Sequence, residues 1–569
     1  MKKKLEALEA TLDQQLESLS IWQASFQSIL STLLLIIDNV GRSKGADTAM
    51  DYLSRLSYLF NKIRDNAANH EVESSASAIM GLAEAHAVDI TFLNAFAHFS
   101  MLMPQIHRGT IVPIKIDGNI YELDYASKEV EAAELMDKLY AAISLQVAVT
   151  YKKETDLYRF LYKKVTLNDS TFAHEDARWI KDMADYYKQF VFIIEVLPSV
   201  VLEQAIGLTY TEYVSLTAAI RAYAEYFLTL ATAYLSQSNS ATDPQTKDVL
   251  MVQYFENIVC CLNSNFVGFF MTISGLSKEK VLRGLSNYMT IYSNNTGENF
   301  VENAFCGDGF FPPICLIDKF IIFSPHSFLY MLNVNNALYS LNKMNQKHFN
   351  DNISHHLEPT LVNQLEYLFL NIPGLSTAKN VHYDKSEIDL LVLSEAEKIC
   401  LVIQVKATIA PDSSRTVQNV QGRALEGIEQ INLFNELSED QKLVLINKEF
   451  NTTLTEVQTV DLLVVRSSAG SAKIWQHNER VRIANYAVLA WIISRMIEAK
   501  EHVIANFSDR IKATQDELVS LSQWKKEMQD LVIGDYTIKM PNLNINMDEI
   551  LPINFRSYKN LPDMEKSHS

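Results

Sequence analysis

The chain has 569 residues, and 48% of them are apolar, which is enough to build several hydrophobic cores. Domains usually span about 100–200 residues, so a chain of this length predicts about three of them. The formal net charge of −18 excludes a protein that attracts nucleic acid through its overall electrostatic field.

The negative charge is unevenly distributed along the chain. Residues 361–495 contain 13 Lys/Arg and 16 Asp/Glu, whereas the rest of the chain contains 37 and 52. The acidity therefore lies mostly outside 361–495, and it argues against the remainder as the main surface that grips nucleic acid.

The cysteines and the N-terminus predict a cytoplasmic protein. The five cysteines lack metal-like spacing and read as reduced thiols. The basic Met1–Lys4 start is not followed by an apolar stretch, so we expect no signal peptide. The longest charge-free stretch, 257–277, is rich in Asn, Ser, Thr and Gly. It favours a buried helix over the alternative of a bilayer span, and we expect no membrane contact.

The first 349 residues are predicted to be mainly helical. Residues 1–105 have apolar side chains at three- and four-residue spacing, the pattern of a helical bundle core. Residues 106–300 continue this pattern, apart from a β-hairpin near 110–125 that turns at Asp117-Gly118. Residues 301–349 form a connecting segment. This part carries no chemical motif and is expected to bind a protein partner or to form a homo-oligomer.

Residues 350–495 predict an α/β domain. A helix with Thr360 as its cap is followed by two strands at 386–393 and 401–407, and then by a helix at 416–437. Two further apolar runs, 443–446 and 460–465, are predicted as strands.

A long helix, continuous or interrupted, is expected from near Ile483 to about Leu531, and 496–569 hold its end and a frayed tail. This order suits a mixed central sheet flanked by helices. The fold class is therefore α+β overall, with a large helical N-terminal region.

Three residues of the two motif strands carry the chemistry. Asp389 begins the first strand, and Gln404 and Lys406 end the second. Residues two apart in a strand share a face, so Gln404 and Lys406 project together. An acid, a carbonyl oxygen and an ammonium at one sheet edge suit a hard cation and a phosphodiester.

Residues 360–470 resemble the core of the PD-(D/E)XK, or restriction-endonuclease-like, nuclease superfamily. Glu366 matches the acid of its leading helix, Asp389 its strand acid and Lys406 its lysine. Gln404 stands where most members have Glu or Asp, and this Gln-x-Lys variant is similar to that of Mrr-like restriction enzymes.

The resemblance implies a Mg²⁺-dependent DNA endonuclease, with Mn²⁺ as a substitute cation. Asp389 and Gln404 would be the metal ligands, Lys406 would act on the attacking water or the transition state, and Glu366 would assist from the helix. The resemblance also implies bacterial defence against phage or foreign DNA. Cutting two strands usually needs two sites, which makes a dimer one expectation.

Other interpretations remain open from the sequence. Asp389 and Lys406 also suit a structural pair across two strands, and Glu387 suits either a replacement acid or a strand-end charge. Arg423 in the next helix suits a phosphate contact, although a solvated helix face is favoured. The rival function is a non-catalytic scaffold or regulator built on a degenerate nuclease fold, and RNA is the alternative substrate.

Overall fold

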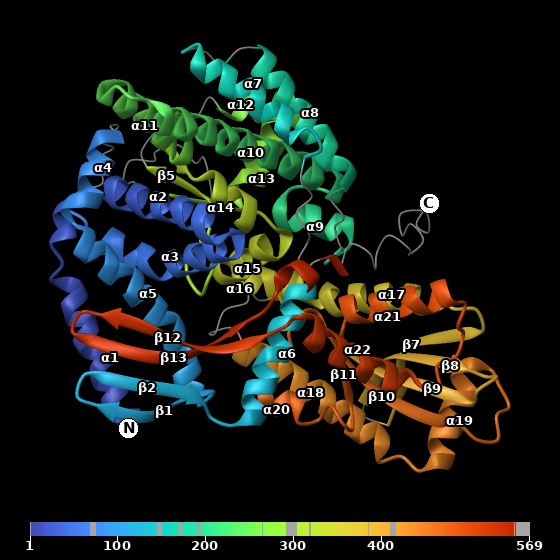
Figure 1. Cartoon of the computed structure of the whole chain (residues 1–569). Coiled ribbons are helices and arrows are strands. Elements are labelled where there is room, and N and C mark those ends of the chain that lie inside the picture. The colour runs from blue at the N-terminus through green and yellow to red at the C-terminus, as the bar shows by residue number, and fades with distance from the viewer. Residues whose placement is uncertain are drawn as a thin grey trace. The chain divides into compact units, whose positions relative to one another are not determined.

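The computed structural model describes most of the chain, and its described residues fold into helices and three sheets (Figure 1). The predicted α+β class with a helical N-terminal region is confirmed. The described residues are 2–68, 76–144, 151–168, 172, 174–190, 195–263, 266–291, 304–317, 320–384, 386–409, 417–550 and 552–553. The last part of the predicted tail therefore lies outside them.

The chain divides into two compact units, each assembled from separated segments. The first contains Met1–Pro104, Val149–Ile353 and Leu531–Thr537, and the second contains Gln105–Ala148, Ser354–Asp530 and Ile538–Ser569. In the parts that the structure describes, no helix combines the length and apolar character needed to cross a bilayer.

The first unit is a helical assembly around α10 (Tyr210–Ser240), which contacts seven other helices in the described part of the chain. Thr209 and Glu212 form a capping box that fixes where this long helix begins. The helices of this unit are α1 (Lys2–Glu17), α2 (Phe26–Lys44), α3 (Ala46–Asn66), α4 (Ala76–Ala85), most of α5 (Ala87–Arg108), α7 (Glu154–Thr166), α8 (His174–Phe190), α9 (Ser199–Ile206), α11 (Pro244–Ile258), α12 (Phe266–Ser274), α13 (Lys278–Ser286), α14 (Pro325–Met331), α15 (Val334–Met344) and α16 (Gln346–Asn352).

A small sheet completes the first unit, with the strand order β3-β6-β5-β4. Its strands are β3 (Cys260–Asn263), β4 (Met289–Ile291), β5 (Ile314–Ile317) and β6 (Phe320–Phe323). Predicted helical periodicity around 260 missed β3, because a strand of this length carries too few residues to reveal its own period.

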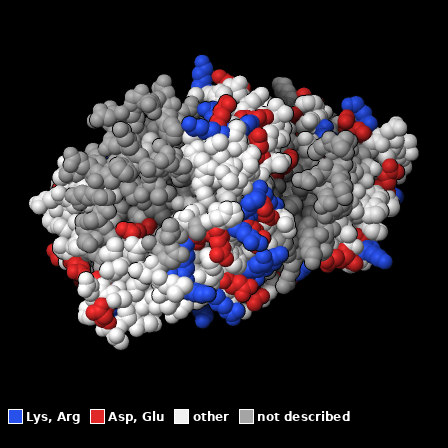
Figure 2. Space-filling view, turned by 90° about the horizontal axis from the view of Figure 1, so that it is seen from above, with Lys and Arg blue, Asp and Glu red and all other residues white. Residues whose placement is uncertain are grey.

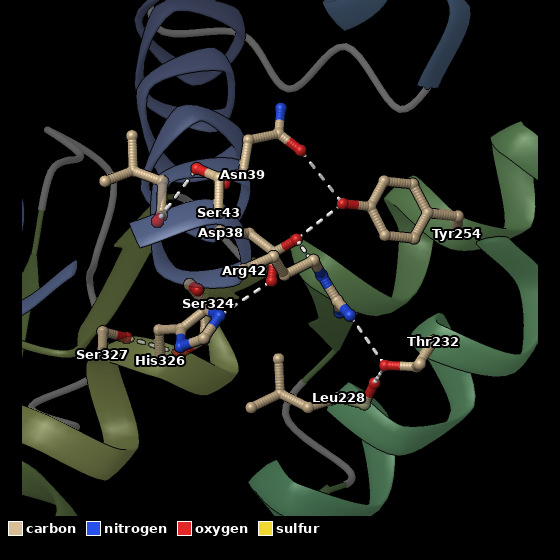
Figure 3. Close-up of polar contacts among 11 residues, drawn as sticks. Asp38, Asn39, Arg42, Ser43, Leu228, Thr232, Tyr254, Ser324, His326 and Ser327 are labelled. Carbon is tan, nitrogen blue, oxygen red and sulfur yellow. Dashed lines mark hydrogen bonds and ion pairs between the residues drawn. The ribbon is translucent and has the colours of Figure 1, made fainter. Parts of the chain in front are cut away.

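A buried carboxylate joins four helices of the first unit (Figure 3). Asp38 is fully buried; its Oδ1 lies 2.7 Å from His326 Nε2, and its Oδ2 accepts hydrogen bonds from Arg42 Nε at 2.7 Å and Tyr254 Oη at 2.6 Å. Arg42 also donates to Thr232. Burial alone would raise the pKa of Asp38, but the hydrogen bonds and charges of His326 and Arg42 lower it. The carboxylate therefore stays charged and holds α2, α10, α11 and α14 together.

On the face that Figure 2 shows, the charged side chains of the described residues carry both signs. Lys and Arg side chains lie among Asp and Glu side chains there, separated by uncharged residues.

The second unit contains a five-stranded mixed sheet with the strand order β11-β10-β9-β8-β7. β7 pairs with β8 and β8 with β9 in antiparallel fashion, whereas β9, β10 and β11 are parallel. In Figure 1, α17 and α21 lie on one side of this sheet and α18 and α19 on the other. Its strands are β7 (Leu375–Tyr383), β8 (Ser386–Ser394), β9 (Ile399–Lys406), β10 (Gln458–Val465) and β11 (Arg482–Asn485).

Helices of the second unit cover this sheet and include one from an early chain segment, α6. The structure thus confirms the predicted mixed sheet flanked by helices. The described helices of this unit are α6 (Lys128–Ser144), α17 (Leu357–Leu370), α18 (Val417–Asn435), α19 (Glu439–Phe450), α20 (Ala472–Trp475), α21 (Tyr486–Ala499) and α22 (Phe507–Leu521).

Three predictions for this region are wrong. Residues 443–446 are not a strand but lie inside α19. The helix predicted to start at Thr360 starts at Leu357, and Thr360 Oγ1 donates to the carbonyl of His356 within the first turn. The long C-terminal helix, predicted as continuous or interrupted, is interrupted where Lys500 takes a left-handed conformation with φ 53° that ends α21, but its predicted end near Leu531 is wrong, because the second helix ends at Leu521.

A third sheet has the strand order β1-β2-β13-β12 and confirms the hairpin predicted near 110–125. Gly118 takes φ 58° in its tight turn, a conformation that glycine adopts without steric cost. The last two strands occupy residues that were predicted to be the helix end and tail. The strands are β1 (Ile111–Asp117), β2 (Ile120–Tyr125), β12 (Lys525–Ile533) and β13 (Tyr536–Asn544).

Candidate active site

The predicted motif residues lie on neighbouring strands of the mixed sheet. β8 and β9 are antiparallel, with Leu390 opposite Ile403 in the ladder. Continuing this register by one residue sets Asp389 beside Gln404, and paired residues in an antiparallel ladder project to the same face. Gln404 and Lys406 are two apart on β9, so all three side chains share the face that α18 covers.

Gln404 is almost completely buried, with 1% of its surface exposed. Its Nε2 donates a hydrogen bond to Oε1 of Gln430 on α18 at 3.0 Å. Its own Oε1 is buried and finds no hydrogen-bond partner among the described residues. An unsatisfied buried carbonyl oxygen costs about 1–3 kcal/mol, so this atom is a candidate ligand for a group that would satisfy it.

Lys406 is also buried, with 4% of its surface exposed, and its stem runs along α18 at Gly427. A Cβ at Gly427 would lie 3.2 Å from both Cγ and Cε of Lys406. The ammonium Nζ lies 3.9 Å from Oε2 of Glu358. Because Gly427 has no side chain, the space beside it is occupied by the stem of Lys406, which extends to the end of the sheet. We call this space the Lys406 channel.

Asp389 is held by the adjacent backbone. Its Oδ2 accepts a hydrogen bond from the Val405 N–H at 2.7 Å. The pKa of Asp389 is raised to about 6, mainly by burial; the Val405 hydrogen bond and the Lys406 charge lower it, and the nearby carboxylates of Glu358 and Glu387 raise it. A carboxyl with a strongly raised pKa beside a buried lysine is the kind of pair found at functional sites.

The acid of the leading helix that reaches this cluster is Glu358, not Glu366. Glu358 lies in the first turn of α17 and makes ion pairs with Lys406 and with Arg423. Glu366 lies two turns further along, where it pairs with Lys379 at 2.6 Å and accepts from Thr377. The resemblance implied Glu366, and Glu358 lay before the predicted helix because Thr360 was predicted as the N-cap, whereas the N-cap is His356.

Arg423 connects α18 to α17 at the mouth of the site. Its Nη2 lies 2.9 Å from Glu358 Oε1, and its Nη1 lies 2.7 Å from Glu426 Oε2. About half of the side chain is exposed. The guanidinium of Arg423 is thus in contact with solvent, and it shares the carboxylate of Glu358 with the ammonium of Lys406. Glu387, the other acid weighed for the site, pairs with His382 at 3.4 Å.

Among the residues that the structure describes, no group of three or more His, Cys, Asp or Glu side chains is arranged to hold a metal ion. Magnesium needs fewer acids than that, because it keeps several waters and binds through one or two carboxylates plus substrate oxygens. The Asp389 carboxylate and the unsatisfied Gln404 Oε1 fit such a site. The donor set is all oxygen, as this cation prefers.

No protein-family model, no curated protein and no solved structure matches this chain. The restriction-endonuclease-like assignment therefore stays a prediction from the sequence motif.

Proposed function

We propose that the chain is a Mg²⁺-dependent DNA endonuclease with its active site at Asp389, Gln404 and Lys406. The observation that carries this proposal is the unsatisfied Gln404 oxygen on the same sheet face as a carboxylate and a buried lysine. Buried polar atoms are rarely left unpaired unless a ligand or water satisfies them.

Each residue has a distinct task in this proposal. Asp389 and Gln404 would hold the cation, which supplies charge neutralisation at the phosphate and a more acidic water. Lys406 donates from its buried ammonium to the attacking water or to the developing phosphate charge. Its burial keeps this donor in one position, so little reorganisation is needed during the reaction.

Glu358 takes the place that the sequence motif assigned to Glu366. Its carboxylate lies against Lys406 and Arg423 and contributes the second negative charge that Gln404 lacks. Arg423, freed from this carboxylate, is positioned to bind a phosphate next to the scissile one, since guanidinium groups pair well with phosphate oxygens.

The biological setting follows from the superfamily resemblance alone. It points to bacterial defence against phage or foreign DNA in the cytoplasm, with the helical unit as the surface for a partner chain or a second copy. Mn²⁺ is the expected substitute cation.

A non-catalytic scaffold is the second candidate function. It is favoured by the ion pairs of Glu358, which neutralise both Lys406 and Arg423. In that case the fold would present a protein-binding surface instead of a reaction centre.

A cleavage assay separates the two functions. The parent, Asp389→Ala, Lys406→Ala and the matched control Lys398→Ala are incubated with supercoiled plasmid and Mg²⁺ or Mn²⁺. Lys398 suits the control because it precedes β9 at the opposite end and pairs only with exposed Glu456. We expect the parent and Lys398→Ala to cut and the other two variants to be inactive.

Equal cutting by all four proteins would overturn the site assignment, and cutting by none would favour the scaffold. A parallel incubation with single-stranded RNA tests the alternative substrate, since RNA cleavage lost in the same two variants would move the proposal from DNA to RNA.

A further inference from the structure

Only one of the two polar groups of the Gln404 amide has a hydrogen-bond partner among the described residues. Its NH₂ group donates to the Gln430 side chain, and its carbonyl oxygen is buried without a partner among the described residues. An amide has two nearly isosteric orientations, one with the oxygen and one with the NH₂ group toward a given neighbour. Only the orientation with the NH₂ group toward Gln430 leaves the oxygen available as a cation ligand.

The neighbour that decides between these orientations is Gln430. In the orientation that Gln430 takes in this structure, its Oε1 faces Gln404 and accepts from the NH₂ group, and it would repel the Gln404 oxygen if the Gln404 amide alone were turned over. The backbone carbonyl of Gln430 separately accepts a hydrogen bond from Tyr383 at 3.0 Å, which anchors this part of α18 to β7. Gln430 thus presents its side chain from a fixed backbone position.

We propose that Gln430 is a positioning residue that turns the carbonyl oxygen of Gln404 toward the cation. This inference rests on the proposed cation site and deepens it, because a neutral ligand at position 404 works only in one amide orientation. Residues that orient metal ligands through a hydrogen bond typically change metal affinity 10–100-fold when they are replaced.

The substitution Gln430→Met tests this role, because it removes the side-chain acceptor at similar size and keeps the backbone carbonyl that Tyr383 uses. Binding of Mn²⁺ alone, without DNA, is measured by calorimetric titration. We expect Gln430→Met to bind Mn²⁺ about 10–100-fold more weakly. Gln430→Glu, which retains an acceptor for the Gln404 NH₂ group, is expected to restore the affinity.

A double-mutant cycle separates positioning from a general structural effect. In a Gln404→Leu background there is no amide to orient, so Gln430→Met is expected to leave Mn²⁺ affinity unchanged within about twofold. An equal loss in both backgrounds, or no loss with Gln404 present, would overturn the inference, as would a parent protein that binds no Mn²⁺.

This experiment is independent of the cleavage assay. A parent that binds Mn²⁺ with the expected dependence on Gln430 but cuts neither plasmid nor RNA would retain the positioning role and refute the endonuclease. Urea unfolding of Gln430→Met serves as the control for folding: it should show one cooperative transition at a lower urea concentration than the parent, because the Tyr383 hydrogen bond is retained but the Gln404 NH₂ group loses its partner.

Discussion

The two protonation states of Asp389 serve different ends. The proposed cation binding needs the charged carboxylate, whereas the stability of the fold favours the protonated one. Its pKa in the folded protein is about 6, against an ordinary value of 3.8. The folded state therefore holds this proton more tightly than the unfolded chain does. The stability contributed by the protonated form is fully present below about pH 4 and is lost as the pH rises through 6.

Replacing Asp389 by Asn removes this ionisation and retains an oxygen for the Val405 N–H. We expect Asp389→Asn to raise the free energy of unfolding by about 1–3 kcal/mol at pH 8, while cleavage is lost. The gain should disappear at pH 4, where the parent carboxyl is protonated as well. Urea unfolding at the two pH values measures it, and a destabilised variant at pH 8 would contradict the argument.

Glu358 neutralises the two cations at the mouth of the candidate site, so under the proposed function DNA would have to displace it to reach them. We expect Glu358→Gln to bind duplex DNA about two- to tenfold more tightly than the parent without divalent cations, since partly exposed ion pairs are worth up to about 1 kcal/mol. Fluorescence anisotropy measures this affinity. Glu456→Gln breaks a similar pair with Lys398 and serves as the control. Weaker DNA binding by Glu358→Gln would contradict the proposed role of Arg423.

The sequence predicted the site residues that depend on strand periodicity but not those that depend on tertiary packing. Gln404 and Lys406 follow from alternation within a strand, and Asp389 from its place in the neighbouring strand. Glu358 required knowledge of where the leading helix begins, and Gln430 required the register between α18 and β9. Neither is encoded in local spacing.

At the scale of elements, α18 positions Lys406 through a glycine. A Cβ at Gly427 would lie 2.8 Å from Leu463 Cδ1 and 3.2 Å from two carbons of Lys406, whereas a Cβ at Gly422 on the same helix has nothing within 4 Å. Alanine favours a helix over glycine by about 1 kcal/mol, so the two positions provide a matched pair.

We expect Gly427→Ala to lower the cleavage rate by about 10–100-fold, because displacing a catalytic group by about 1 Å has effects of this size. Gly422→Ala should cut like the parent and be more stable by up to about 1 kcal/mol. Initial rates on supercoiled plasmid and thermal unfolding measure the two effects. Full activity in Gly427→Ala would show that the channel does not position Lys406.

The elements that sequence analysis missed are short or polar. Residues 443–446 are apolar and were predicted as a strand, but they lie in α19. The capping box of Ser438 and Gln441 that begins this helix is a pattern that the sequence itself contains. β11 is only four residues long. β7 carries exposed polar side chains as the edge strand of its sheet, so it lacks the apolar alternation that identifies half-buried strands.

At the scale of the whole molecule, the unit that contains the candidate site draws on an early segment of the chain. The sequence predicted a domain from 350 to 495, whereas the compact unit also includes Gln105–Ala148. Asp137 on α6 accepts hydrogen bonds from the backbone N–H groups of Ala469 and Gly470 and from Trp475 Nε1. Long-range pairing of this kind leaves no local signal, because each partner resembles an ordinary polar residue in its own segment.

Asn485, at the end of β11, is the residue on which this assembly depends most directly. It is fully buried, and its Nδ2 donates at 3.0 Å to the Tyr140 carbonyl and to Ser144 Oγ on α6, and to the Ser467 carbonyl after β10. Its Oδ1 accepts from the Val488 N–H and caps α21. One side chain therefore joins three segments that are distant in the sequence.

We expect Asn485→Ala to destabilise the chain by about 2–4 kcal/mol, because it removes a helix cap and leaves buried acceptors unsatisfied. The loss should appear in urea unfolding at neutral pH, followed by a probe near the contact such as the fluorescence of Trp475. Asn363→Ala is the control, since Asn363 accepts only an exposed hydrogen bond from Lys379. If both variants unfolded like the parent, α6 would not be an integral part of the unit that carries the site.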